Sequence, residues 1–164
     1  MSRSRRGAPE GSGSSLTRGE RIALRPLTED DIAAVKPWYE EAVAAAMVRP
    51  AADAQRLAIV LESDGTVIGL LEYRANSPDR GWLSVGFIAV ARVWRGWGFG
   101  SEAVRLVEAE AKAERFRANV DVRDGLGLYF WLRLGYRPAR RDEVPGQPPH
   151  GIITMVRTAG DAPG

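Results

Sequence analysis

The alternation of apolar and polar residues predicts a succession of short strands between residues 19 and 158. Alternating or continuous apolar runs, bounded by Gly, Pro, Asn or Asp, are typical of strands. Such runs cover residues 21–26, 57–62, 66–73, 82–90, 119–122, 136–138 and 152–157. The run 82–90 is almost wholly apolar, as expected of a central strand that is buried on both faces. Ser63, Asp64 and Gly65 predict a hairpin turn between the second and third strands.

Two helices are predicted among these strands. Thr28, followed three residues later by Asp31, resembles a capping box and predicts a helix that continues to about residue 46. Apolar residues recur at helical spacing between Phe99 and Ala113, which predicts a helix packed on the sheet. The charged residues of this segment lie largely off the apolar stripe; they are Glu102, Arg105, Glu108, Lys112 and Arg115.

A further helix follows near the C-terminal end of the predicted domain. Leu126, Phe130 and Leu134 mark its apolar side, and Gly135 predicts its C-terminal cap. Asp124 is the predicted cap at its N-terminal end.

The length of 164 residues fits one domain with its own core. Residues 1–18 are rich in Ser, Gly and Arg and predict a disordered tail. The domain is expected to span residues 19–158, with a short flexible tail at 159–164.

Composition narrows the range of functions. The chain has no cysteine, which excludes disulfides and cysteine chemistry, and its one histidine, His150, lies among Pro and Gly. We therefore expect no metal site and no Ser-His-Asp triad, and we interpret His150 as a loop residue. A net charge of +2 gives no argument for nucleic-acid binding. No apolar stretch is long enough for a membrane span or a secretory signal, so we expect a cytoplasmic protein.

The segment with the clearest chemistry is a glycine-rich loop that opens a helix after a buried strand. Its residues are Arg95, Gly96, Trp97, Gly98, Phe99, Gly100 and Ser101. Glycines allow close backbone approach, and first-turn N–H groups have no intrahelical partner, so this loop predicts a phosphate site. A turn without a ligand is the simpler alternative. A P-loop is absent, and a dinucleotide fingerprint fits poorly because Ser101 replaces its third glycine, although Asp121 lies at a suitable distance.

Two motifs resemble those of the GNAT superfamily of N-acetyltransferases. Arg95-x-x-Gly98-x-Gly100 is similar to that family's acyl-CoA signature, [QR]-x-x-G-x-[GA]. Residues 127–136 are similar to its late segment, A-x-x-L-Y-x-x-L-G-[FY]. The matching order of elements covers residues 21–157, nearly the whole chain outside the tails. The family often has an asparagine before the late helix and a basic residue at position 97, and neither is found here.

The resemblance implies a mixed α/β (α+β) fold, in which helices flank a mostly antiparallel sheet, and a site for acetyl-CoA between two splayed strands. Backbone groups of Ile88, Ala89 and Val90 would pair with the pantetheine arm. The N–H groups from Gly96 to Ser101 would hold the pyrophosphate. The resemblance also assigns to Tyr129 the role of the tyrosine that protonates the leaving thiolate.

The predicted reaction is acetyl transfer from acetyl-CoA to a primary amine by direct attack, since without cysteine no acyl-thioester enzyme can form. Glu72, Asp121 or water would take the amine proton. The acceptor, a small molecule or a peptide, would meet residues 30–55, where Glu40 and Glu41 weakly favour a cation. A catalytically inactive acyl-CoA-binding module and a cofactor-free interaction domain are the alternatives. A homodimer is also compatible with the sequence.

Overall fold

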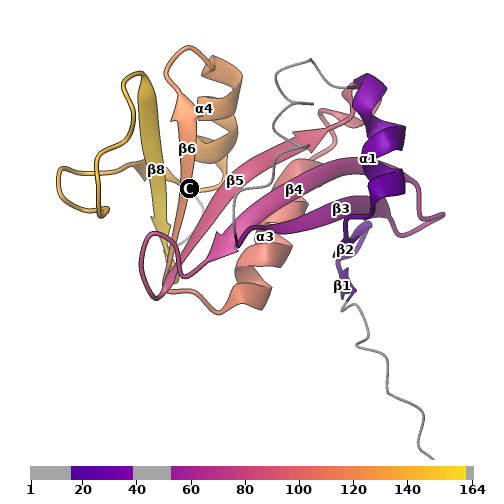
Figure 1. The fold of residues 1–164 in the computed structure, drawn as a ribbon, viewed down its shortest axis with the longest axis horizontal. Helices are drawn as coiled ribbons and strands as arrows, with labels where there is room; N and C mark the ends of the chain where they lie inside the picture. The colour runs from indigo at the N-terminus through magenta and orange to yellow at the C-terminus, as the bar shows by residue number, and fades with distance from the viewer. Residues whose placement is uncertain (1–15, 39–52, 162–164) are drawn as a thin grey trace, which may run out of the picture.

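The computed structural model describes residues 16–38 and 53–161, which form one eight-stranded sheet with helices on both faces. The strand order is β1-β2-β3-β4-β5-β6-β8-β7 (Figure 1). The strands are β1 Thr17–Arg18, β2 Ile22–Pro26, β3 Gln55–Leu61, β4 Val67–Ala75, β5 Trp82–Val90, β6 Arg115–Asp121, β7 Arg137–Pro138 and β8 Ile152–Thr158. The helices are α1 Glu29–Val35, α3 Phe99–Ala111 and α4 Gly125–Arg133, with 3₁₀ turns at Lys36–Trp38 and Arg92–Trp94.

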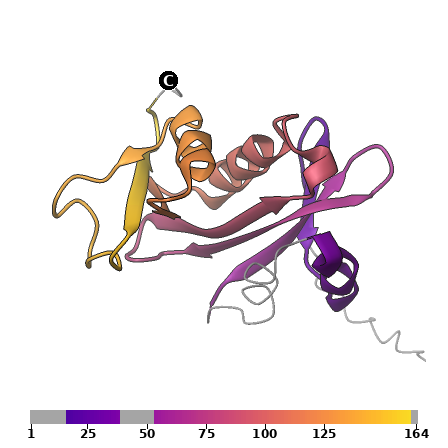
Figure 2. The same cartoon turned by 90° about the horizontal axis from the view of Figure 1, so that it is seen from above.

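Every neighbouring pair of strands is antiparallel except β5 and β6, which are parallel. A parallel pair needs a crossover, and α3 supplies it. Figure 2 shows α3 and α4 on one face of the sheet and α1 on the other. The predicted single domain with a mixed, mostly antiparallel sheet and flanking helices is confirmed.

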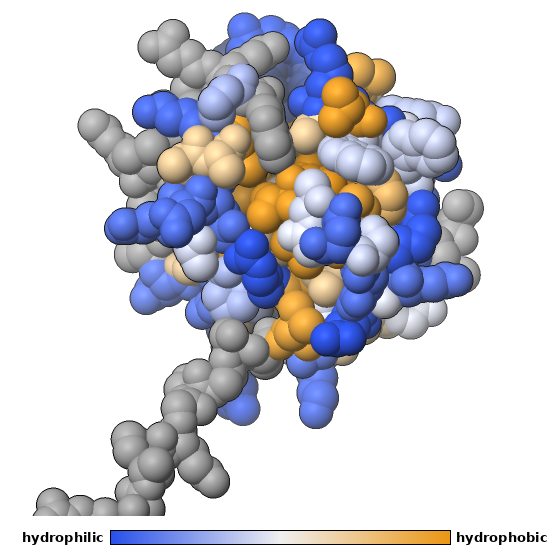
Figure 3. All heavy atoms as spheres, turned by 90° about the vertical axis from the view of Figure 1, so that its right-hand side faces the viewer, coloured by the Kyte–Doolittle hydropathy of each residue, from blue (hydrophilic) through white to orange (hydrophobic). Residues whose placement is uncertain are grey.

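Two apolar clusters form the core, one on each face of the sheet. The larger cluster lies under α3 and α4 and includes Phe99, Val104 and Trp131. The smaller cluster lies on the α1 face and includes Val35 and Leu70. At the α1 end of the molecule, hydrophobic residues gather at the centre of the surface and hydrophilic ones surround them (Figure 3).

The capping box that opens α1 is confirmed and extended by an arginine. The backbone N–H of Asp31 donates to the Thr28 hydroxyl, and the backbone N–H of Thr28 donates to Asp31 Oδ2 at 2.8 Å. Both Nη groups of Arg25 donate to the Asp31 carboxylate, at 2.7 and 2.8 Å. The helix ends at Val35 and a 3₁₀ turn follows; the rest of the predicted helix, residues 39–46, lies outside the described residues.

We expect Asp31→Asn to lower the free energy of unfolding by about 1–3 kcal/mol at pH 7, because the neutral amide loses the charge-assisted bonds to Arg25. These bonds hold the pKa of Asp31 at about 2, below its ordinary 3.8. The stabilisation is thus present above about pH 4 and is lost as pH falls from about 4 to 2. Urea unfolding at pH 7 and pH 2.5 measures both effects. Asp30→Asn, at an exposed neighbouring position, is the control and should change neither value.

Several element boundaries differ from the predicted ones by one or more residues. Thr17 and Arg18, assigned to the tail, form β1 and pair with Leu24 and Ala23 of β2. The helix predicted to reach Ala113 ends at Ala111, where Lys112 takes a positive φ of 50°. Strand β6 begins at Arg115 rather than 119. Its arginines alternate with buried apolar residues, and arginine at alternate positions conceals a strand from a reading based on hydrophobicity alone.

Glu108 was assigned to the solvent side of α3, but it is buried in the core. The Tyr136 hydroxyl donates to Glu108 Oε1 at 2.5 Å, and the Arg157 guanidinium donates to Oε2. Burial and the adjacent carboxylate raise the pKa of Tyr136, so its phenol stays protonated as a donor. The carboxylate is thus tolerated in the core because two side chains distant in sequence satisfy it.

Candidate active site

The central feature of the site is the divergence of β5 from β6. The two strands pair only from Trp82–Val85 to Arg115–Ala118, although both continue beyond this point. On its other edge β5 stays paired with β4, and Gly86 is an extra residue between the pairs Tyr73–Val85 and Glu72–Phe87. Such a bulge bends a strand and increases its twist. The bulge therefore lies where the strands separate.

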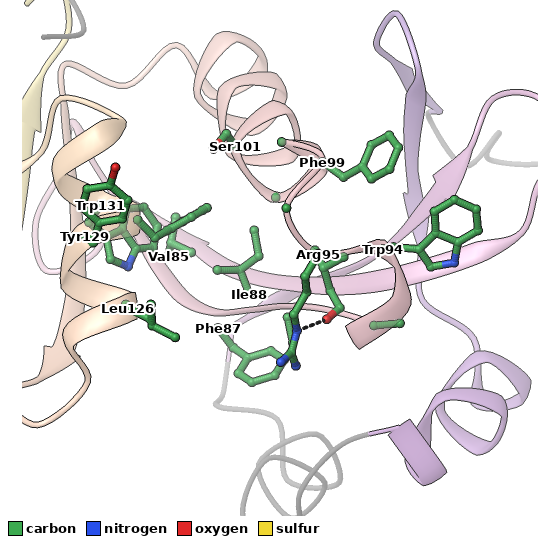
Figure 4. Close-up of a pocket in the computed structure, with 18 of the residues that line it drawn as sticks. Val85, Phe87, Ile88, Trp94, Arg95, Phe99, Ser101, Leu126, Tyr129 and Trp131 are labelled. Atoms are coloured by element: carbon green, nitrogen blue, oxygen red, sulfur yellow. Dashed lines mark hydrogen bonds between the residues drawn. The ribbon is translucent and has the colours of Figure 1, made fainter.

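The divergence opens a cleft of about 1460 Å³. Its walls are the second half of β5, the following loop, the start of α3, the end of β6 and one side of α4 (Figure 4). Most small-molecule sites have about 300–1,000 Å³. The cleft therefore has room for a long ligand. It also explains why β5 is buried only as far as Val85, whereas residues 86–90 were expected to be buried on both faces.

The free edge of β5 offers backbone groups at alternate residues. The N–H of Ala91 donates to Ile68 of β4 at 2.8 Å. Because successive residues point their backbone groups to opposite edges of a strand, those of Ala89 also turn toward β4. Ile88 and Val90 turn theirs into the gap. Of the three residues predicted to pair with a ligand, Ala89 therefore has no backbone group available for it.

The glycine loop joins this edge to α3. Gly96 and Gly98 have φ values of 85° and 82°, a region that disfavours other residues, and Gly98 is the N-cap of α3. The N–H groups from Gly96 to Ser101 donate to no acceptor among the described residues. They lie at the positive end of the helix dipole, beside the cleft. This arrangement suits a phosphate group.

The loop side chains have separate roles. Trp97 is 66% exposed, whereas Phe99 is buried in the larger cluster and can serve the cleft mainly through its backbone. Arg95 donates through Nε to the Val90 carbonyl at 2.8 Å (Figure 4). That bond ties the start of the loop to the free edge of β5.

Nothing in the sequence indicated a role for Arg21, which directly precedes β2 and contacts the glycine loop. It donates to the Trp97 carbonyl at 2.9 Å, pairs with Glu102 at 2.9 Å, and lies over the Phe99 ring at 4.5 Å. By binding that carbonyl it fixes the peptide orientation at the start of the helix. The sequence separation of Arg21 from the loop left no local signal for this contact.

Both predicted ends of α4 are confirmed. The Asp124 carboxylate accepts from the Gly127 N–H at 2.8 Å. At the other end Gly135 has a φ of 88°, its N–H donates to Leu132, and that of Tyr136 donates to Trp131. These two bonds form a Schellman motif.

Tyr129 and Trp131 of α4 both line the cleft. Tyr129 is 58% exposed and Trp131 is 6% exposed. In the motif A-x-x-L-Y-x-x-L-G-[FY] the tyrosine stands four residues before the glycine, and counting back from Gly135 gives Trp131. Tyr129 is therefore two residues away from the position that the resemblance was taken to assign it. Of the described residues that line the cleft, it is nevertheless the only tyrosine.

The comparisons with known proteins agree with this geometry. A family model described as "Acetyltransferase (GNAT) family" matches residues 23–136. The chain belongs to the acetyltransferase (GNAT) family. None of the curated proteins matches the sequence.

Solved structures share the fold of this acetyltransferase. A probable GNAT-family acetyltransferase from Chromobacterium violaceum has 18% identity and a TM-score of 0.69, with 96% of this chain and 97% of that one covered. An acetyltransferase from Thermus thermophilus has 14% identity and a TM-score of 0.65, covering 85% and 97%. A chimera of the spermidine N-acetyltransferase SpeG of Vibrio cholerae with hSSAT has 14% identity and a TM-score of 0.61, covering 85% and 96%. At these identities the likeness concerns the fold.

The two carboxylates considered as bases in this acetyltransferase lie in different places. Asp121 lines the cleft but accepts two bonds from the Arg123 side chain, which hold its pKa at about 2. A carboxylate with so low a pKa is a weak base. Glu72 pairs with Arg56 at 3.0 Å and lies next to the bulge, since a Cβ built on Gly86 would be 3.2 Å from its Oε1.

Within the described part of this acetyltransferase, no group of three or more acidic or histidine side chains is arranged to hold a metal ion. His150 is exposed in the loop between β7 and β8, as predicted. No described helix has the length and apolar character needed to cross a membrane.

Proposed function

We propose that this acetyltransferase moves the acetyl group of acetyl-CoA to a primary amine by direct attack in a ternary complex. The observation that carries the proposal is the run of unpartnered N–H groups from Gly96 to Ser101, which open α3 at the mouth of the cleft. A long cleft with an anion site at one end matches the shape and charge of an acyl-CoA. The similarity to a spermidine N-acetyltransferase supports an amine as the acceptor.

In this proposal the chain holds acetyl-CoA mainly through its backbone. The N–H groups from Gly96 to Ser101 bind the pyrophosphate. Ile88 and the N–H of Val90, whose carbonyl accepts from Arg95, pair with the pantetheine amides along the free edge of β5. This leaves the acetyl thioester near the bulge at Gly86, where the strands part. The side chains of Trp97 and Phe99 are assigned no specific contact with acetyl-CoA.

The chemical step replaces a C–S bond by a C–N bond. The amine nitrogen attacks the acetyl carbon, the thiolate of CoA leaves, and the amine loses one proton. We assign the protonation of the thiolate to Tyr129, because a phenol can donate a proton without being charged at rest. We assign the amine proton to Glu72, directly or through water, because Glu72 lies beside Gly86 and Asp121 is a weak base.

One observation favours the second candidate, an acyl-CoA-binding module without catalysis. The residue in register with the motif's tyrosine is Trp131, and an indole N–H does not act as an acid at physiological pH. If Tyr129 does not take over the role of the motif's tyrosine, the protein would bind acetyl-CoA without efficient acetyl transfer.

Two measurements test the proposal. Calorimetric titration should show that acetyl-CoA binds, and thiol release should depend on an added primary amine. Binding without thiol release for any amine in a broad panel would identify the binding module. Failure of acetyl-CoA to bind to the folded protein would refute both candidates.

A further inference from the structure

Two arginines lie on either side of Ser84, just below the point where β5 and β6 diverge. Arg74 of β4 pairs with Ser84 of β5, which in turn pairs with Arg117 of β6. Residues that face each other across strands share one face of a sheet, so the three side chains form a row. Leu70, four residues before Arg74, belongs to the cluster on the α1 face. The row is therefore on the face opposite α3 and α4.

Neither arginine of this row has a carboxylate partner among the described residues. Two acidic residues on the same strands, Glu72 of β4 and Asp121 of β6, are paired with Arg56 and Arg123. The two arginines therefore lie on either side of Ser84, and neither forms an ion pair with a described residue. Burial, and secondarily the proximity of Arg74, lower the pKa of Arg117.

The side chain of Arg117 is held in place by Ser84. Its Nε donates to the hydroxyl of Ser84 at 2.6 Å, and that hydroxyl donates to the Ser77 carbonyl. Ser84 itself is only 6% exposed. The two Nη groups of Arg117 have no acceptor among the described residues, and neither is sealed from solvent. Such a fork binds a carboxylate through two parallel bonds.

A second hollow, of about 360 Å³, is lined by Arg117 of this row. Its charged lining consists of Arg117, Arg140, Arg141 and Asp142, an excess of positive charge. Asn119 lines both this hollow and the cleft, so the two meet there. Along β6, Arg117 is two residues from Asn119, which is about 7 Å at the usual rise of a strand. A small molecule that binds Arg117 can therefore reach the opening between the strands.

We propose that the acceptor is an amine with a carboxylate close to the reacting nitrogen, as in an amino acid, and that Arg74 and Arg117 bind that carboxylate. The inference rests on the proposed function and adds the class of acceptor to it. Glu40 and Glu41, which had favoured a cationic acceptor, lie outside the described residues. The described surface beside the opening has the charge that suits an anion.

Matched acceptors test this inference. Thiol release from acetyl-CoA is measured with glycine, leucine and phenylalanine, with the amide of each, and with spermidine. The native protein should prefer the acids to their amides by about tenfold or more in kcat/KM, as expected for charge-assisted bonds to a carboxylate. Arg117→Gln and Arg74→Gln should bring this ratio toward one, mainly by raising KM for the acids. Arg117→Lys should keep part of the preference, because it retains the charge and loses the fork.

The control is Arg80→Gln, at an exposed position in the turn before β5, which should leave the ratio unchanged. Thermal unfolding checks that each variant is folded. A preference for the amides or for spermidine in the native protein would overturn the inference and leave the proposed function intact. An acid-to-amide ratio that Arg74→Gln and Arg117→Gln do not change would have the same meaning. Acetyl-CoA binding without turnover of any of these amines would also overturn the inference, and the broader amine panel would then decide between transfer and the binding module. Failure of acetyl-CoA to bind would instead refute the proposed function itself.

Discussion

Gly98→Val should weaken acetyl-CoA binding by at least about 100-fold. Gly98 has a φ of 82°, which a β-branched residue adopts only under strain. A Cβ at this position would also lie 3.5 Å from Nη2 of Arg21, whose guanidinium binds the Trp97 carbonyl. The loop would have to change its course, and the N–H groups from Gly96 to Ser101 would no longer converge on one anion.

The measurement is calorimetric titration with acetyl-CoA, and stability is followed separately because Gly98 also caps α3. We expect the free energy of unfolding to fall by about 1–3 kcal/mol. Gly65→Val is the matched control. Gly65 has a φ of 75° in the turn before β4, and a Cβ there would meet nothing within 4 Å. This variant should lose similar stability and keep its affinity. Unchanged affinity in folded Gly98→Val would remove the glycine loop from the binding site.

Local sequence signals predicted the elements that local chemistry determines. The Thr28–Asp31 box, the turn at residues 63–65 and the Gly135 cap each depend on residues a few positions apart. All three are found in the structure: Gly65 has a φ of 75° and its N–H donates to the Leu61 carbonyl at 2.8 Å. The glycine loop was predicted for the same reason, since helix-start geometry depends on the residues within it.

What the sequence could not predict depends on contacts between distant segments. The sequence pattern suggests a surface position for Glu108, but in the folded chain Tyr136 and Arg157 donate hydrogen bonds to it in the core. The register of β5 with β4 determines which residues of β5 turn their backbone groups into the gap. Because of this register, the backbone groups of Ala89 face β4 and not a ligand. The row of Arg74 and Arg117 arises only from the pairing of three strands.

The position of the acid on α4 is a different kind of problem. The late motif predicted the helix and its end correctly. Tyr129, however, does not occupy the position of the motif's tyrosine. Trp131 occupies that position, and its ring packs against the ring of Tyr136, with 4.7 Å between the ring centroids. The helix therefore needs Trp131 for its packing, and only Tyr129 remains on it as a phenol beside the cleft. An experiment on the hydroxyl alone can separate the two roles.

Tyr129→Phe should lower kcat by roughly 100-fold, the effect expected when a general acid is lost. The ring remains and is 58% exposed, so the free energy of unfolding should change by less than about 0.5 kcal/mol. Acetyl-CoA affinity should be nearly unchanged, because the proposed contacts to it come from the backbone of the glycine loop and β5. The measurement is turnover at saturating substrates, under conditions in which chemistry is shown to limit the rate.

Leu132→Ala is the control, since Leu132 is an exposed neighbour on α4 that does not line the cleft. It should leave kcat unchanged. The departing thiolate is a fair leaving group even without a proton, because an ordinary thiol has a pKa near 8.5. We therefore set the boundary at about fivefold, well below the effect of a lost general acid. If Tyr129→Phe keeps kcat within that limit, Tyr129 is a surface residue of α4, and water protonates the thiolate.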